Sequence, residues 1–134
     1  MQLSAIVALV LSAKADPNWI NYSIIGLGLL IILVAIAQMT TFSKVKIMPQ
    51  PHPGAVLMRT GIYRYVRHPM YTGVIMATLG LMLTNTLCWR ILLWVLLIIV
   101  LLLKIQLEEK LLHQKFPDYA SYAAVSKKLI PFTW

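Results

Sequence analysis

The sequence predicts an all-α, polytopic membrane protein with about four transmembrane helices. Of its 134 residues, 60% are hydrophobic and only 12% are charged, and the mean hydropathy is +0.78. A soluble globular domain carries about 25% charged residues. A chain of this length forms a single domain, residues 1–134. Its net charge of +8 is explained by basic residues that flank membrane spans rather than by nucleic-acid binding.

The first two predicted spans are residues 2–13 and 19–39. The first is short, because a helix of that length reaches only about 20 Å and the hydrocarbon core is about 30 Å thick. A cleaved leader peptide is the alternative, since residues 13–15 resemble a signal-peptidase site. We favour the span because no Lys or Arg precedes it. The second has about the required 20 apolar residues, with Trp19 and Tyr22 at interface depth.

A helical hairpin is predicted for the long apolar stretch that follows, with spans at 69–83 and 89–103. Pro69 suits the first turn of a helix, where its missing N–H costs nothing. Gly73, Ala77 and Gly80 lie on one face of the third span, which is typical of close helix packing. The last span is expected to continue as a helix through residues 104–115.

Positive charge sets the predicted orientation. Ten of the 12 basic residues lie in two segments, five in the loop 40–68 and five in the tail 104–134. The positive-inside rule therefore places both segments, and both termini, in the cytoplasm of a prokaryotic cytoplasmic membrane. The loop is rich in Pro and Gly, so we expect irregular backbone that lines a cavity. Loop and tail together are expected to form a polar pocket.

Glu108 and Glu109 are the main candidates for chemistry, being half of the four acidic residues and following a nearly uncharged span. They are either a solvated helix end or a site for a cationic ligand. Glu109 points to a different face and is expected to fix the tail or the loop arginines. His68 either caps the start of the third span or lines the site. No metal site is expected, because the histidines and Cys88 lack zinc-ligand spacing; Cys88 is expected to pack as a small apolar residue.

Three motifs carry a family resemblance: "RTGIYRYVRHPMYTG", "EEKLLHQKFPDYASY" and "LIPFTW". In combination they resemble the isoprenylcysteine carboxyl methyltransferase and phospholipid methyltransferase group of integral-membrane enzymes. The resemblance covers roughly residues 51–134. It implies methyl transfer from S-adenosylmethionine to a lipophilic acceptor at the cytoplasmic membrane face, in a pocket made by the loop, the last span and the tail.

The resemblance also implies roles for individual residues. Lys104 and Glu108 are expected to be catalytic. Lys104 stands where eukaryotic members have an acceptor-binding arginine. Lysine cannot bind a carboxylate through two parallel hydrogen bonds as arginine does, and this disfavours an isoprenylcysteine carboxylate as the acceptor. Ala55 replaces a family histidine, and His52 is the substitute we consider. The residues expected to bind the cofactor are His52, Val56, Leu57, Met58, Tyr63, Arg67, His68, Pro69, Met70, Tyr71 and Glu108.

Two other functions remain open at this point. One is an NADPH-dependent membrane reductase of the sterol reductase type, which shares an R-H-x-x-Y-x-G element but is longer and lacks the paired glutamates. The other is a non-catalytic membrane scaffold of the same fold, favoured by the departures at Ala55 and Lys104. The expected partners are the bilayer and a lipid or lipophilic small molecule, with no nucleic acid.

Overall fold

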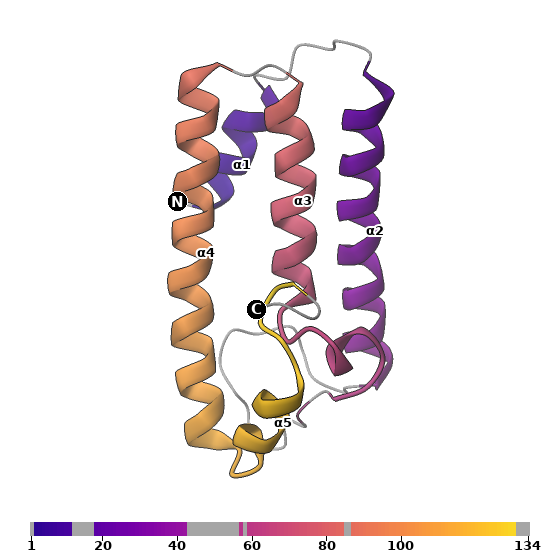
Figure 1. The fold of residues 1–134 in the computed structure, drawn as a ribbon, viewed down its shortest axis with the longest axis vertical. Helices are drawn as coiled ribbons and strands as arrows, with labels where there is room; N and C mark the ends of the chain where they lie inside the picture. Colours follow the sequence, from indigo (N-terminus) through magenta and orange to yellow (C-terminus); the bar gives the residue numbers. More distant parts are fainter. Residues whose placement is uncertain (1, 12–17, 43–56, 58, 85–86, 131–134) are drawn as a thin grey trace.

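The computed structural model shows a bundle of helices that run alternately up and down (Figure 1). It describes residues 2–11, 18–42, 57, 59–84 and 87–130. Apart from one parallel bridge between Val66 and Lys127, these residues form no β structure. The elements are α1 (Gln2–Leu11), α2 (Trp19–Phe42), the 3₁₀ helix η1 (Gly61–Arg64), α3 (Pro69–Leu83), α4 (Cys88–Lys115) and α5 (Tyr119–Val125).

The helix boundaries agree closely with the sequence prediction. Two helices are long and apolar enough to cross a membrane, over Trp19–Thr41 and Cys88–Lys115, and α3 is a shorter apolar helix. The α3 bounds are those predicted, and α4 continues to Lys115 as expected. Helix α1 has 10 residues and therefore reaches about 15 Å; residues 12 and 13 of the first predicted span lie outside the described residues. Four complete spans therefore remain a prediction.

Helices α2 and α3 pack with their backbones nearly in contact. A Cβ placed on Gly28 would lie 2.5 Å from the backbone nitrogen of Ala77 and 2.7 Å from the Gly73 carbonyl oxygen. On Gly80, a Cβ would lie 2.9 Å from the Asn21 carbonyl oxygen. The close packing predicted for the small-residue face of α3 is confirmed, and its partner is α2.

Arg90, at the start of the predicted span 89–103, is fully buried in the first turn of α4. Its Nη2 donates to the carbonyl oxygens of Leu9 at 3.1 Å and Leu81 at 2.7 Å. Its Nη1 donates to the Thr84 hydroxyl at 3.3 Å. Helix ends leave their last carbonyls unpaired, so Arg90 ties the ends of α1 and α3 to the start of α4. Cys88, expected to pack as a small apolar residue, is exposed at the surface of the protein.

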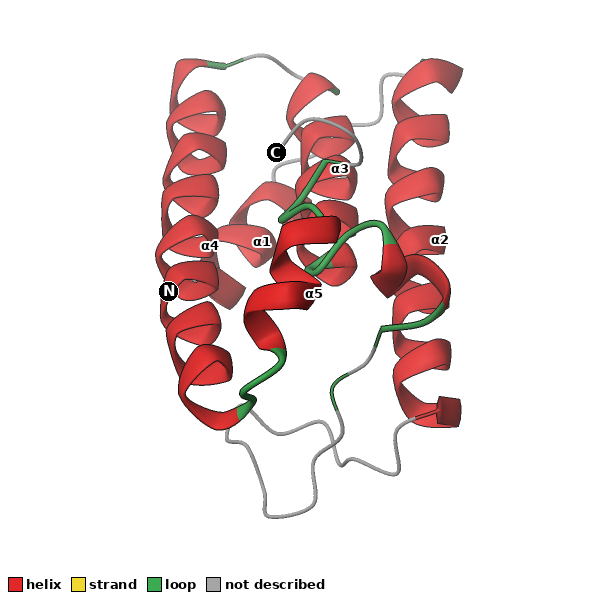
Figure 2. Ribbon diagram, turned by 60° about the horizontal axis from the view of Figure 1, so that its bottom comes forward, coloured by secondary structure: helices red, strands yellow, loops and turns green. Residues whose placement is uncertain are grey.

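The opposite end of the bundle is polar, and we call it the polar end. There α2 and α4 finish and α3 begins, with η1 beside α2 and α5 beside α4 (Figures 1 and 2). Residues 126–130, the tail segment, pair with the chain that enters α3. The backbone N–H of Arg67 donates to the Lys127 carbonyl at 2.7 Å, and that of His68 donates to the Lys128 carbonyl at 3.1 Å. The tail segment thereby holds the start of α3 in place.

Candidate functional site

Four of the predicted site residues meet where α3 begins and α4 leaves the bundle, and we call them the Glu108 cluster: His68, Tyr71, Lys104 and Glu108. The Tyr71 hydroxyl donates to Glu108 Oε1 at 2.6 Å. The His68 ring stacks on Tyr71 with 5.7 Å between centroids, and its Nδ1 lies 3.7 Å from Glu108 Oε2. Lys104 Nζ lies 5.4 Å from the Tyr71 ring centroid.

Local sequence explains why these side chains converge. Pro69 is the first residue of α3. Tyr71 therefore lies in the first turn of this helix, close to His68, which precedes it. Lys104 and Glu108 are four residues apart on α4 and so share one helix face. The Glu108 side chain is 29% exposed, so it is partly accessible from outside the protein.

Glu109 belongs to a separate and more buried ion-pair group. Its carboxylate lies 2.9 Å from Arg67 Nε, 3.4 Å from His68 Nε2 and 3.9 Å from Lys128 Nζ. Burial disfavours the charged form, but the neighbouring His68 ring and the charges of Arg67 and Lys128 outweigh it and lower the pKa of the Glu109 carboxyl. The expectation that Glu109 contacts a loop arginine is confirmed, and His68 lies between the two carboxylates.

Arg67, predicted to bind the cofactor, is engaged with protein groups. Besides Glu109, its Nη1 donates to the carbonyl oxygens of Ala123 at 2.7 Å and Ser126 at 2.8 Å. Its side chain is 8% exposed. In this geometry Arg67 joins α4, α5 and the tail segment; its contact with a cofactor remains a prediction.

Tyr63 is not brought into the Glu108 cluster. It is buried, and its hydroxyl donates to the Ala35 carbonyl of α2 at 3.5 Å. Its own carbonyl accepts a hydrogen bond of 2.5 Å from the Tyr122 hydroxyl. Burial and the neighbouring Tyr122 raise the pKa of Tyr63. The tyrosine thus fixes η1 between α2 and α5.

The remaining predicted residues are more dispersed. Pro69 is fully buried, and Leu57 and Met70 are half-buried. His52, Val56 and Met58 lie outside the described residues, so their predicted roles stay predictions. No group of three or more metal-ligating side chains occurs among the described residues.

Two tyrosines of α5 were singled out in the sequence only as part of a motif. Tyr119 is 1% exposed and meets the His113 ring edge-on, with 4.6 Å between centroids. It also packs against Tyr122. Burial is the main cause that raises the pKa of both hydroxyls. Their spacing of three residues is the signal that could have indicated a buried helix face.

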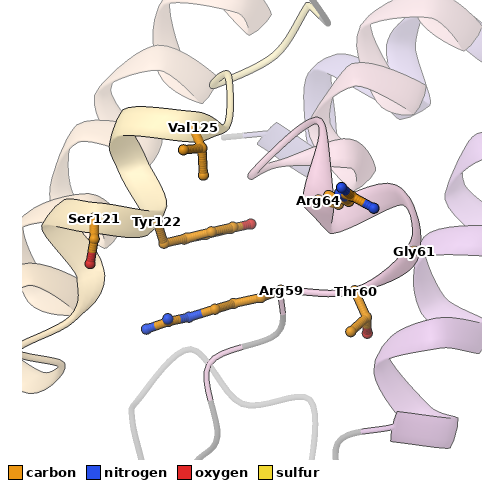
Figure 3. Close-up of a pocket in the computed structure, with 7 residues that line it drawn as sticks. All are labelled: Arg59, Thr60, Gly61, Arg64, Ser121, Tyr122 and Val125. Carbon is orange, nitrogen blue, oxygen red and sulfur yellow. The ribbon is translucent and has the colours of Figure 1, made fainter.

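A cavity of about 510 Å³ lies elsewhere at the polar end, between η1 and α5 (Figure 3). None of its lining residues belongs to the Glu108 cluster. We place the candidate site at the Glu108 cluster because a partly exposed carboxylate beside an aromatic face suits a cationic ligand. The lining residues of the cavity, by contrast, include two arginines: Arg59, Thr60, Gly61, Arg64, Ser121, Tyr122 and Val125.

Comparison with known proteins places this geometry in context. The sequence model of the phospholipid methyltransferase family matches residues 18–119, more than half of the 134-residue chain. The matched region contains α2, α3, α4 and the whole Glu108 cluster. No curated protein and no solved structure matches the chain.

Proposed function

The chain belongs to the phospholipid methyltransferase family, and from this premise we propose that it transfers a methyl group from S-adenosylmethionine to a lipophilic acceptor at the cytoplasmic face of a membrane. The observation that carries the proposal is the Glu108 carboxylate. It is partly exposed, it accepts the Tyr71 hydroxyl at 2.6 Å, and it lies at the end of an apolar helix.

The chemistry of the Glu108 cluster fits this cofactor. S-adenosylmethionine carries a sulfonium and an ammonium, and both are stabilised by a carboxylate and by an aromatic face. The Tyr71 ring already has a cation near it, since Lys104 Nζ is 5.4 Å from its centroid. Glu108 would bind the positive end of the cofactor, with Tyr71 and His68 beside it.

When bound, the cofactor supplies an activated methyl group, so the protein needs little acid–base chemistry. The role of the chain is to hold the two reactants in line. The hydrogen bond from Tyr71 fixes the Glu108 carboxylate, and His68 is in turn fixed by its backbone bond to the tail segment. Lys104, one turn before Glu108, is the group proposed to orient a polar or anionic acceptor headgroup.

A lipophilic acceptor is supported by the surface of α4 beside the cluster. Leu103 and Leu107 are each 60% exposed, and Leu111 is 37% exposed. These side chains continue the apolar surface of the helix up to Lys104 and Glu108, so a lipid could reach the cluster sideways from the bilayer. The proposed topology has four spans with both termini in the cytoplasm, which puts the polar end on that side.

Membranes that contain the full chain should incorporate label from methyl-labelled S-adenosylmethionine into a lipid extract. Glu108→Gln should reduce incorporation at subsaturating cofactor by about 10- to 150-fold, because it removes a charge-assisted hydrogen bond worth about 1.5–3 kcal/mol. Lys110→Gln, an exposed change on the same helix, is the control. Label in no lipid, or equal incorporation by the Glu108 variant, would contradict the proposal. Binding of NADPH instead would favour a reductase, and binding of neither ligand a scaffold.

A further inference from the structure

The His68 ring lies between the two carboxylates of α4, and each of its nitrogens is close to one of them. Nδ1 is 3.7 Å from Glu108 Oε2, and Nε2 is 3.4 Å from Glu109 Oε1. The side chain is only 7% exposed. Its position is fixed, because the ring stacks on Tyr71 and the backbone N–H donates to the Lys128 carbonyl. His68 is therefore held between two groups that can only accept a hydrogen bond.

The neutral and the protonated ring interact differently with this pair of carboxylates. A neutral imidazole has one N–H and one nitrogen lone pair, so it must turn the lone pair toward one of the two acceptors. The protonated ring presents an N–H to both. The Nε2 atom is buried and forms no hydrogen bond among the described residues, and a buried polar atom of this kind calls for an explanation. A positive charge on the ring, facing Glu109 at 3.4 Å, supplies one.

The two carboxylates depend on His68 to different extents. Glu109 also has Arg67 at 2.9 Å and Lys128 at 3.9 Å. For Glu108, His68 is the one group of the described residues within 4 Å that can carry a positive charge. A cation that binds Glu108 therefore meets the protonated ring beside the same carboxylate, and like charges repel. Loss of the proton from His68 removes this repulsion.

The other ionisable groups around the ring do not offer the same exchange near neutral pH, where imidazole ordinarily changes its charge. Arginine stays charged, and the lowered pKa of Glu109 keeps that carboxyl ionised. Burial raises the pKa of Tyr119, which keeps its proton, and the Tyr71 hydroxyl donates its proton to Glu108. Lysine ordinarily loses its proton only at high pH. The ionisable groups from the adjoining elements are Arg67 of the loop, Tyr71 of α3, Lys104, Glu108 and Glu109 of α4, Tyr119 of α5 and Lys128 of the tail segment.

We propose that binding of the cationic cofactor at Glu108 releases a proton from His68 to solvent. The proton has a route outward, because Nδ1 faces Glu108 and that side chain is 29% exposed. At low pH the cofactor must displace the proton and binds weakly; once the ring is neutral, affinity reaches its maximum. Cofactor affinity therefore rises with pH. The inference rests on the proposed function, since it uses the same cofactor and the same carboxylate.

The test is calorimetric titration of the purified full chain in detergent with S-adenosylmethionine, in buffers of different ionisation enthalpy. The dependence of the measured heat on the buffer gives the number of protons released. At about pH 6.5 the wild type should release about half a proton or more, and its affinity should be about tenfold lower at about pH 5.5 than at about pH 7.5. His68→Gln should release no proton and bind equally at both pH values, within about twofold. His113→Gln, which changes an exposed histidine of α4, is the control and should behave as the wild type.

The outcomes separate this inference from the proposed function. Binding of S-adenosylmethionine without proton release, or release that persists in His68→Gln, would overturn the inference and leave the proposed function standing. Absence of binding at every pH would overturn both. Should His68→Gln not fold, methylthioadenosine is the matched ligand for the wild type, because it lacks both positive charges of the cofactor. It should bind without proton release, and equal release with the two ligands would overturn the inference.

Discussion

The interface of α2 with α3 and the junction at the polar end are held together by different forces. At the interface, glycine lets two backbones come together, and a Cβ on Gly28 would lie 2.5 Å from a backbone atom of α3. At the junction, Arg67 and Glu109 form a nearly buried ion pair of 2.9 Å that joins α4 to the loop and the tail segment. The first region cannot accept added volume, and the second cannot lose a charge. Only the second offers groups for chemistry.

The largest effect is expected from Arg67→Gln. This change leaves Glu109 buried without its closest partner, and breaking a buried pair costs about 3–5 kcal/mol. The melting temperature of the purified protein should fall strongly. Arg59→Gln is the matched control, because its partner Asp118 is 80% exposed and such surface pairs contribute about 0–1 kcal/mol. Similar melting temperatures for the two variants would contradict the contrast between buried and exposed pairs.

A smaller loss is expected at the α2–α3 interface from Gly28→Ala. The new methyl group would collide with the backbone of α3, and overpacking of this kind costs about 1–3 kcal/mol. Gly26→Ala, two residues away, has nothing within 4 Å of the added Cβ and should leave the melting temperature unchanged or raise it. If both alanines have the same effect, the two helices are not in backbone contact.

The smallest effect is expected from Tyr122→Phe. The variant removes the hydrogen bond to the Tyr63 carbonyl, and the free energy of unfolding should fall by about 0.5–1.5 kcal/mol. Tyr65→Phe is the control, because Tyr65 is 54% exposed. Thermal melting of both variants checks the expectation. A larger loss for Tyr65→Phe would mean that α5 is not fixed through Tyr122.

The apolar part of the fold could be predicted because its signals are local. Continuous apolar runs define α2 and α4, Pro69 fixes the start of α3, and small residues four or three positions apart mark the face that meets α2. Each of these signals lies within one helix. The meeting of Tyr71 with Glu108 came from motif resemblance, and the structure brings the two together.

The remaining features depend on contacts between distant residues, which carry no periodic pattern. The pairing of Arg67 with Lys127 joins backbone groups that are 60 positions apart in sequence, and backbone bonds leave no mark on side-chain composition. Arg90 stands at the start of the predicted span 89–103, and nothing in the local sequence indicates that it is buried and bonded to the carbonyl oxygens of Leu9 and Leu81. Tyr63 matched a cofactor motif, but its contacts are with α2 and α5.

The central claim is that Glu108 binds the cofactor while Glu109 holds the junction together. Calorimetric titration with S-adenosylhomocysteine, paired with melting curves, tests it on Glu108→Gln and Glu109→Gln. Glu108→Gln should weaken binding by about 10- to 150-fold and leave the melting temperature without ligand nearly unchanged, because its carboxylate is the more exposed of the two. Glu109→Gln should lower the melting temperature more than the affinity. Equal affinity losses, or a larger loss for Glu109→Gln, would contradict the account.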